Sequence, residues 1–214
     1  MFDDVMCILP HSISAQVYST LKREILEGIL PPGERLIVMD IAGRFQISQA
    51  PVREALERLK QEGLIIGKAN KGSVVANVTA KEIHDVYILR GMLEVFAVRK
   101  TMPLLTEGDL LYLEDVVCRM GEAIERNDLM KTVEIDTEFH GFFYKNCGNH
   151  AILKAWEHMS AKVMWFMAIS NKRHSTDKLA EGHMALIQSL RSGNVGKAEK
   201  HFLEHIKHAH IGFI

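Results

Sequence analysis

The sequence predicts a mostly α-helical protein of two domains. Residues 1–78 are expected to form a winged helix-turn-helix, and residues 79–214 an all-α bundle of six or seven helices. Three observations support this prediction. A helix with both ends marked follows a short helix and a tight turn, two short β-branched runs flank a Gly/Asn turn, and only helical patterns follow residue 80.

The most informative stretch is residues 48–63, which we expect to form the second helix of the helix-turn-helix. Ser48 can cap its first turn with the side-chain hydroxyl, and Gly63 can end it in the left-handed conformation. Gln49 and Arg53 are left for its outer face. The apolar residues that recur at helical spacing predict its buried face, and they are Val52, Ala55, Leu56 and Leu59.

Shorter patterns predict the rest of the first domain. A helix at residues 38–45 comes before the turn, and in such a pair the second helix enters the DNA major groove by its N-terminal end. A further helix is expected from residue 12 or 14 to residue 27. Residues 64–66 and 73–75 are expected to form a hairpin whose tip carries two lysines, one of them Lys71. That tip is either a DNA-contacting wing or a solvated turn.

The charge of the chain is unevenly distributed. Over 214 residues the net charge is −1, so the chain as a whole shows no electrostatic preference for nucleic acid. Between residues 44 and 71, however, six basic residues stand against three acidic ones. A local excess of positive charge is what contact with DNA phosphates requires.

Cysteine usage and hydropathy predict a cytoplasmic protein. The three cysteines lie far apart and form no pair at metal-ligand or redox spacing, which favours a reducing compartment. Asp3 and Asp4 stand where a secretion signal would carry positive charge. The longest apolar run, residues 163–169, is too short to cross a bilayer and is expected to pack in the centre of the bundle.

The second domain is predicted to be helical throughout. Thr79 and Glu82 form a capping-box pattern that marks the start of its first helix. Gly148 and Gly193 mark the ends of two later helices. The expected helices are 80–101, 107–126, 128–147, 150–170, 177–191 and 195–211. Their connections are short enough for neighbouring helices to run antiparallel.

Four side chains of this domain have the spacing of a candidate metal site. Asp136 and His140 are four residues apart, so they share one face of a helix. His183 and His205 lie on two later helices, and a carboxylate and three imidazoles from three helices could converge in a bundle core. Spacing alone leaves open the ordinary alternative that these side chains are solvated or hydrogen-bonded.

Several motifs of the first domain are similar to those of a known family. Pro-Gly-Glu-Arg-Leu at 32–36, Ser-x-x-Pro-Val-Arg-Glu-Ala-Leu-x-x-Leu at 48–59 and Glu-Gly-Leu-Ile at 62–65 resemble the winged helix-turn-helix of GntR-type bacterial transcription regulators. The resemblance implies binding to double-stranded DNA. The residues expected to contact DNA are Arg35, Arg44, Ser48, Gln49, Arg53 and Lys71. The alternative is an ordinary amphipathic helix pair in a helical domain.

An all-α domain of this size after such a winged helix resembles the FCD effector domain of the FadR-like branch. Metal-binding members of that branch carry Asp-x-x-x-His on one helix and one histidine on each of two later helices. The resemblance therefore implies a divalent transition metal as cofactor, and three nitrogens with one oxygen suit Zn²⁺, Ni²⁺, Mn²⁺ or Fe²⁺. The implied ligands are Asp136, His140, His183 and His205.

The same resemblance implies a small organic acid as the effector. Asn149 stands in the Gly-Asn setting expected for the family, and Arg90 matches a position that faces the effector cavity. Arg90 could bind the carboxylate of an acid in bidentate fashion. Alternatively, it forms an ordinary intrahelical pair with Glu94, four residues further on.

Two positions depart from the family pattern. Relatives usually have arginine directly after the capping serine, where this chain has Gln49, and many have a basic residue where Met39 stands. Arginine pairs best with guanine, whereas glutamine favours adenine. We therefore expect Gln49 to move the preferred half-site away from the family's common guanine contact.

These patterns together predict a homodimeric transcription regulator, a repressor, that binds a palindromic operator because a two-fold dimer repeats its half-site. An acid effector at the metal would change the relative placement of the two winged helices. One alternative is a metalloenzyme, since three histidines, one carboxylate and open positions also describe hydrolytic or oxidative centres. No general base stands out near the four residues in sequence. The other alternative is a regulator whose metal is structural or is itself the signal.

Overall fold

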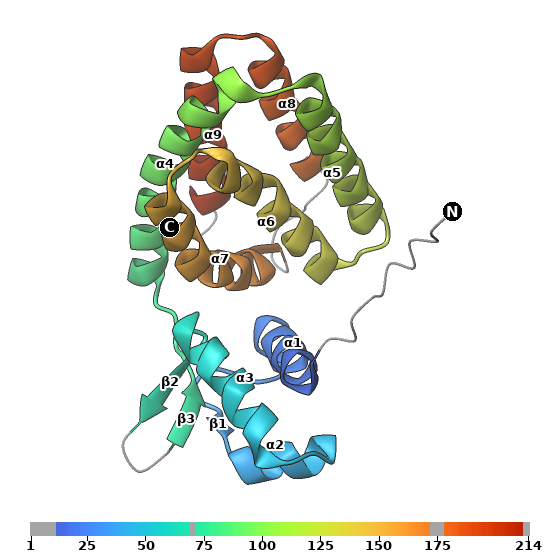
Figure 1. Ribbon diagram of the computed structural model, residues 1–214, viewed down its shortest axis with the longest axis vertical. Coiled ribbons are helices and arrows are strands. Elements are labelled where there is room, and N and C mark those ends of the chain that lie inside the picture. The colour runs from blue at the N-terminus through green and yellow to red at the C-terminus, as the bar shows by residue number, and fades with distance from the viewer. Residues whose placement is uncertain (1–11, 69–71, 172–177, 212–214) are drawn as a thin grey trace, which may run out of the picture. The chain divides into compact units, whose positions relative to one another are not determined.

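The computed structural model describes residues 12–68, 72–171 and 178–211. The chain divides into two compact units, one up to Ala76 and one from Asn77 onward, where the sequence predicted a boundary after residue 78. Figure 1 labels the helices and strands of both units.

The N-terminal unit combines three helices with a small antiparallel sheet. Its elements in chain order are α1 (Ile13–Leu26), β1 (Arg35–Leu36), α2 (Val38–Phe45), α3 (Gln49–Gln61), β2 (Ile65–Lys68) and β3 (Gly72–Val75). The sheet order is β1-β3-β2, and all pairs are antiparallel. The predicted helix-turn-helix and hairpin are confirmed, whereas the sheet has one strand more than predicted.

The additional strand, β1, pairs with the outer edge of β3. Arg35 lies opposite Val74, and Leu36 lies opposite Ser73. The strand has two residues, so no alternation of apolar and polar side chains could reveal it in the sequence. The backbone N–H of Gly33 also donates to Val75 and extends this pairing. The prediction of a two-stranded hairpin was therefore incomplete.

Helix α3 packs against α1 and α2 through the predicted apolar stripe. Val52, Ala55 and Leu59 are completely buried, and Gly63 has the expected left-handed conformation (φ +71°). Ser48 occupies the N-cap position with extended backbone, but its side chain forms no capping hydrogen bond. The expected hydroxyl cap is thus absent, and the position of the serine marks the helix start without that bond.

The C-terminal unit is an all-α bundle, as predicted. Its helices are α4 (Ala80–Thr101), α5 (Glu107–Glu125), α6 (Leu129–Asn146), α7 (His150–Asn171), α8 (Leu179–Arg191) and α9 (Val195–Ile211), with a short 3₁₀ helix at Met102–Leu104. Thr79 and Glu82 form the predicted capping box at the start of α4. No helix of the described segments is long and apolar enough to cross a membrane.

Helix α6 lies in the middle of this bundle (Figure 1). It packs against α4, α5 and α7, while α9 packs along α4 and α8 packs against α5 and α9. Phe139 and Phe143 of α6 are completely buried; Phe139 stacks with Phe202 of α9, and Phe143 contacts the same ring edge to face. The apolar run of α7 is buried at Val163, where it packs against α6, so its predicted packing role is confirmed. The polar side chains that α6 carries at its centre are therefore enclosed by the other helices.

Candidate functional site

The outer face of α3 presents Gln49 and Arg53, as predicted. Both side chains are exposed, and Arg53 Nη2 donates a hydrogen bond of 3.0 Å to Gln49 Oε1. The two residues lie one turn apart in the N-terminal half of the helix, which is the half that reads bases in a helix-turn-helix. The hydrogen bond orders both side chains on one face before any DNA is bound.

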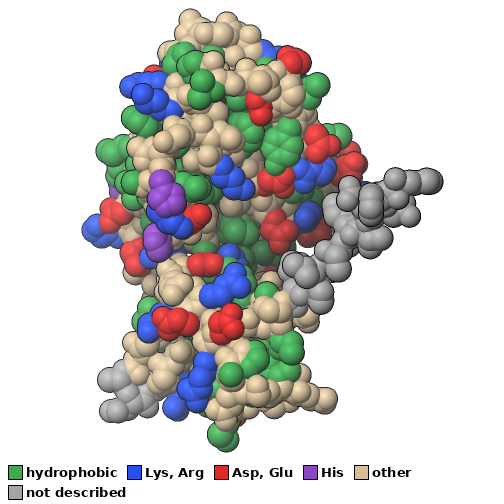
Figure 2. All heavy atoms as spheres, viewed as in Figure 1, with side chains coloured by type: hydrophobic (Ala, Val, Ile, Leu, Met, Phe, Trp, Pro, Cys, Tyr) green, Lys and Arg blue, Asp and Glu red, His purple; other side chains and the backbone are tan. Residues whose placement is uncertain are grey.

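The other predicted DNA-contacting residues have different surroundings. Arg44 forms a bidentate ion pair with Glu24 of α1, in which Nη1 lies 2.8 Å from Oε2. Arg35 on β1 and Ser48 before α3 are exposed. Lys71 lies outside the described residues. On the face drawn in Figure 2, basic side chains of the N-terminal unit lie beside acidic ones. Of this set, Arg44 is thus held in an ion pair within the unit, whereas Arg35 and Ser48 are exposed.

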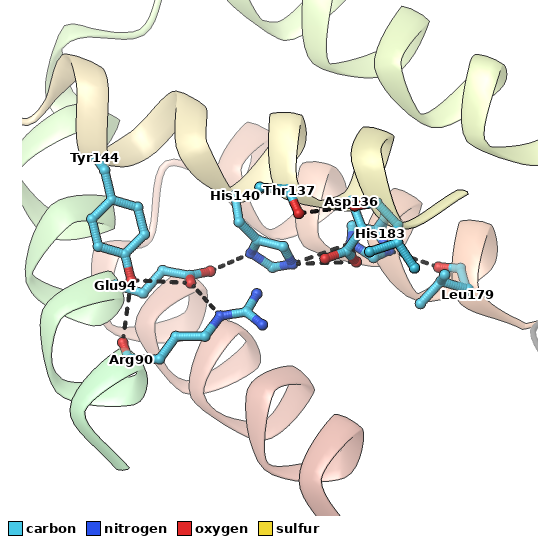
Figure 3. Close-up of polar contacts among 9 residues, drawn as sticks. Arg90, Glu94, Asp136, Thr137, His140, Tyr144, Leu179 and His183 are labelled. Atoms are coloured by element: carbon cyan, nitrogen blue, oxygen red, sulfur yellow. Dashed lines mark hydrogen bonds and ion pairs between the residues drawn. The ribbon is translucent and has the colours of Figure 1, made fainter. Parts of the chain in front are cut away.

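The four predicted metal-binding residues come together inside the bundle. Asp136 and His140 lie one turn apart on α6, His183 is on α8 and His205 is on α9. One potential ligand atom from each lies within 4.8 Å of all the others. The side chains of Asp136, His140 and His183 are buried, and Figure 3 shows them facing one another. The group has the composition and size of a site that could hold a metal ion.

Hydrogen bonds on the far side of two imidazoles determine which ring nitrogens face the centre. His183 Nδ1 lies 2.8 Å from the backbone carbonyl of Leu179. A carbonyl only accepts, so Nδ1 carries a proton, and in the neutral form of the ring Nε2 presents a lone pair. His140 Nδ1 donates in the same way to a carboxylate oxygen of Glu94. In the neutral tautomers that these bonds select, both Nε2 atoms are acceptors.

These acceptors point at one another and at a carboxylate. The two Nε2 atoms lie 3.2 Å apart. Asp136 Oδ1 lies 3.1 Å from Nε2 of His183 and 3.8 Å from Nε2 of His140. Asp136 Oδ2 is buried and has no hydrogen-bond partner among the described residues. When both rings are neutral, these lone pairs converge without a donor and repel one another, and a bound cation removes that repulsion. The donor set therefore fits a metal ion.

The ionisation of the cluster also fits a metal ion. Burial lowers the pKa of His140 and lowers that of His205 well below its usual value, so both rings stay neutral at neutral pH. Burial alone would raise the pKa of Asp136, but the imidazoles of His140 and His183, where they carry a proton towards it, and the charge of Arg90 lower that pKa. Neutral imidazoles and an ionised carboxylate are the forms that bind metals.

Glu94 is the residue of this site that the sequence did not reveal. It is completely buried and accepts hydrogen bonds from His140 Nδ1, from Arg90 Nε at 3.0 Å and from Tyr144 Oη at 3.3 Å (Figure 3). The sequence showed Glu94 only as a partner four residues from Arg90. Its contact with His140 depends on the packing of α4 against α6, which has no local signal.

The two predicted effector-binding residues lie in different places. Arg90 is buried, forms the intrahelical pair with Glu94 and is close enough to Asp136 to lower its pKa. Asn149 is exposed, and its side chain accepts a hydrogen bond of 3.2 Å from the backbone of Ile152 in the first turn of α7. Asn149 thus serves as a helix cap, whereas Arg90 belongs to the buried cluster.

Family models match nearly the whole chain. Residues 13–75 match the model described as bacterial regulatory proteins, gntR family, and residues 85–208 match the FCD domain. The chain is 26% identical to the uncharacterized HTH-type transcriptional regulator YdhC of Bacillus subtilis (strain 168), over 96% of this chain and 93% of that protein. It is 25% identical to the HTH-type transcriptional repressor RspR of Escherichia coli (strain K12), over 91% of this chain and 86% of the repressor.

Solved structures share the fold. E. coli McbR/YncC superposes with a TM-score of 0.78 at 22% identity, covering 92% of this chain and 94% of that one. A putative GntR regulator from Rhodococcus sp. RHA1 gives the same TM-score at 21% identity, covering 94% of this chain and 96% of the other. The chain belongs to the GntR family of bacterial transcription regulators, with an FCD domain after its helix-turn-helix, and is a DNA-binding transcription regulator and not an enzyme.

Proposed function

We propose that the chain is a homodimeric repressor whose two α3 helices bind a palindromic operator, and that a metal ion in the helical unit receives the carboxylate of a small organic acid. The metal would be a divalent transition ion held by Asp136, His140, His183 and His205. Binding of the acid would then change the affinity for the operator, which requires that the acid bind the two arrangements of the dimer with different affinity.

The observation that carries the proposal is the convergence of acceptors in the buried cluster. The Nε2 atoms of His140 and His183 lie 3.2 Å apart, and both have their other ring nitrogen engaged as a donor. Asp136 adds an ionised carboxylate with one oxygen that has no partner among the described residues. Buried polar groups in native proteins are normally paired, so this arrangement supports a cation as the missing partner.

The donor set also supports the class of metal and of effector. Three nitrogens and one carboxylate oxygen are compatible with Zn²⁺, Ni²⁺, Mn²⁺ and Fe²⁺. When bound, such an ion supplies a positive charge and, if its coordination number exceeds four, positions for an anionic oxygen ligand. A small carboxylic acid has both the charge and the oxygen atoms for these positions.

Arg90 supports an acid as well. Its Nε is held by Glu94 at 3.0 Å, and its guanidinium group is close enough to lower the pKa of Asp136. The Nη atoms form the outer end of the guanidinium group, which can bind a carboxylate in bidentate fashion. Glu94 therefore fixes the orientation of Arg90 and of His140 at the same time.

Repression is inferred from relatives. RspR of E. coli is named a repressor, and so are the probable D-xylose utilization operon repressor of Paenarthrobacter nicotinovorans (28% identical) and the gluconate operon repressor of Bacillus licheniformis (24% identical). The homodimer is inferred from the helix-turn-helix, because a single recognition helix reads too few base pairs for a specific operator and dimers double the half-site.

The test uses operator DNA selected from random sequence with the purified full chain. Affinity is measured by fluorescence anisotropy for chelator-treated protein and for protein loaded with Zn²⁺, Ni²⁺ or Mn²⁺, each with a panel of short acids such as acetate, malonate and succinate. The proposal expects an acid to weaken operator binding only when metal is present. Arg90→Met should lose this response while it keeps the metal.

A second function is favoured by one observation. Arg90 already has an ion-pair partner in Glu94, so its guanidinium group does not need an effector to neutralise it. A regulator whose metal is purely structural would contain the same pair. In that case the metal would raise the stability of the helical unit, but no acid in the panel would change operator affinity. If operator affinity is the same with and without metal and acid, the effector part of the proposal is wrong and the DNA-binding part remains.

A further inference from the structure

Three polar residues follow one another along one face of α6. Asp136, His140 and Tyr144 are each four positions apart, so their side chains lie in one row on the helix. Asp136 and His140 belong to the candidate metal site, and Tyr144 lies one turn beyond it. Tyr144 is only 1% exposed. A buried tyrosine hydroxyl normally has a hydrogen-bond partner, and here the partner leads back to the site.

The hydroxyl of Tyr144 reaches across to α4 (Figure 3). It lies 3.3 Å from Oε2 of Glu94 and 3.4 Å from the backbone carbonyl oxygen of Arg90. Carboxylate and carbonyl oxygens only accept, so the hydroxyl donates its single proton to them. The other oxygen of Glu94 accepts the hydrogen bond from Nδ1 of His140. One buried carboxylate therefore connects the hydroxyl of Tyr144 to a predicted metal ligand.

The orientation of this carboxylate depends on its donors and not on the glutamate side chain itself. The terminal torsion of a glutamate is broad, so the carboxylate plane turns unless hydrogen bonds hold it. Arg90 Nε donates to Glu94 at 3.0 Å, but it lies on α4 one turn from Glu94 and moves with it. Tyr144 lies on α6, the helix that also carries His140. It is therefore the donor that holds the carboxylate in place relative to the helix of the metal ligand.

The ring of Tyr144 is held in turn by Trp156 of α7. The two rings are stacked at 13° from parallel, and their centroids lie 4.5 Å apart. Gly141, directly after His140, makes room for the indole ring, because a Cβ atom there would lie 3.1 Å from Nε1 of Trp156. Both aromatic residues are buried. Substitution of Tyr144 by phenylalanine would thus remove the hydroxyl and leave the stacked ring in place.

We propose that Tyr144 is a positioning residue of the metal site and acts through Glu94. The inference rests on the metal ion of the proposed function and adds a residue that prepares one of its ligands. The hydrogen bond from His140 Nδ1 to Glu94 selects the neutral tautomer in which Nε2 presents its lone pair to the centre. Tyr144 holds the carboxylate where it accepts that bond. The hydroxyl therefore contributes to metal affinity without touching the metal.

A purely structural hydroxyl would behave differently. If it only held α4 against α6, its loss would lower the free energy of unfolding of the metal-free and the metal-loaded protein equally. Metal affinity would then stay the same, because the stability that a ligand adds depends only on its affinity and its concentration. A positioning hydroxyl instead contributes more to the loaded protein than to the metal-free one. Metal affinity therefore separates the two roles.

Tyr144→Phe in the full chain tests the proposal, with Zn²⁺ affinity measured by competition with a chromophoric chelator. The substitution should weaken Zn²⁺ binding by about 3–10-fold, which corresponds to the contribution of one ordinary hydrogen bond. The matched control is Tyr112→Phe, because the hydroxyl of Tyr112 also donates to a carboxylate of α6, that of Glu138, at 2.9 Å. Tyr112 is 42% exposed and lies outside the cluster, so its hydroxyl should not affect Zn²⁺ affinity.

Two further measurements test how the hydroxyl acts. Urea unfolding with and without Zn²⁺, followed by tryptophan fluorescence, should show that Tyr144→Phe reduces the stability gained from the metal, whereas Tyr112→Phe does not. In a Glu94→Gln background, Tyr144→Phe should change Zn²⁺ affinity by less than about 2-fold, because the carboxylate that transmits its effect is gone. Native affinity in Tyr144→Phe, or an equal loss in both backgrounds, would overturn the inference and leave the proposed metal site intact. A native chain that binds no Zn²⁺ would overturn both.

Discussion

Glu94→Gln should strongly destabilise the helical unit, because it removes one partner of a buried ion pair. The side chains of Glu94 and Arg90 are 0 and 2% exposed, and Arg90 Nε lies 3.0 Å from Glu94 Oε2. Burial alone would raise the pKa of Glu94, but His140 and Arg90 lower it, so the side chain is an anion at neutral pH. Glutamine keeps the shape of the side chain but removes its charge and replaces one acceptor oxygen by an NH2 donor.

The expected loss follows from leaving the guanidinium group of Arg90 buried without its nearest counter-charge. Removing one partner of a buried ion pair costs about 3–5 kcal/mol. For a chain of this size, each kcal/mol corresponds to roughly 2–4 °C in the melting temperature, so the shift should be roughly 6–20 °C. Asp136 is a second anion near Arg90 and favours the lower end of this range.

The two tryptophans of the chain provide a selective assay. Trp156 and Trp165 both lie on α7 and are buried, so their fluorescence reports the unfolding of the helical unit alone. Urea titrations of chelator-treated protein exclude any contribution from bound metal. Glu199→Gln is the matched control, because it breaks the exposed ion pair with Arg99 and should have a much smaller effect. Equal losses for the two variants, or a loss below about 1 kcal/mol for Glu94→Gln, would refute the reasoning.

Three further predictions concern the site, the DNA-binding face and the helix starts. Glu94→Gln should weaken Zn²⁺ binding by about 10–100-fold, measured by calorimetry, because Glu94 fixes the tautomer of His140; unchanged affinity would contradict that role. Gln49→Arg should change the bases selected from random DNA from adenine towards guanine at one position of each half-site, and identical selections would end the idea. Thr79→Ala removes the capping box of α4 and should cost about 1 kcal/mol in the tryptophan-detected unfolding of the helical unit, whereas no loss would show that the box is dispensable.

Much of the fold could be predicted because local chemistry marks the ends of its helices. The capping box of Thr79 and Glu82 and the left-handed glycines, such as Gly63, are determined by residues close in sequence. Strand β1 could not be predicted, because its two residues are extended only through pairing with β3, nearly forty positions further on. The hydroxyl cap expected from Ser48 is absent, although the helix begins where the serine indicates.

The residues of the candidate site also fall into those that the sequence reveals and those that it does not. The spacing of Asp136 and His140 places them on one face of α6 whatever surrounds the helix, so this half of the site is visible in the sequence. The role of Glu94 is not, because it depends on the contact between α4 and α6. Asn149 was expected to bind the effector only because of the family resemblance. In the structure its side chain caps the first turn of α7, a local role that the sequence around it explains.

The central claim is that the buried cluster of the helical unit binds a metal ion, and its most direct test is the metal content of the protein. Elemental mass spectrometry would compare the native chain, His183→Ala and the control His208→Ala after purification without chelator or a histidine tag. His183 is buried in the cluster, whereas His208 is exposed on α9. The account predicts about one transition-metal ion per chain in the native protein and in the control, and none in His183→Ala. No metal in the native protein, even after dialysis against Zn²⁺, Ni²⁺ and Mn²⁺, would contradict it.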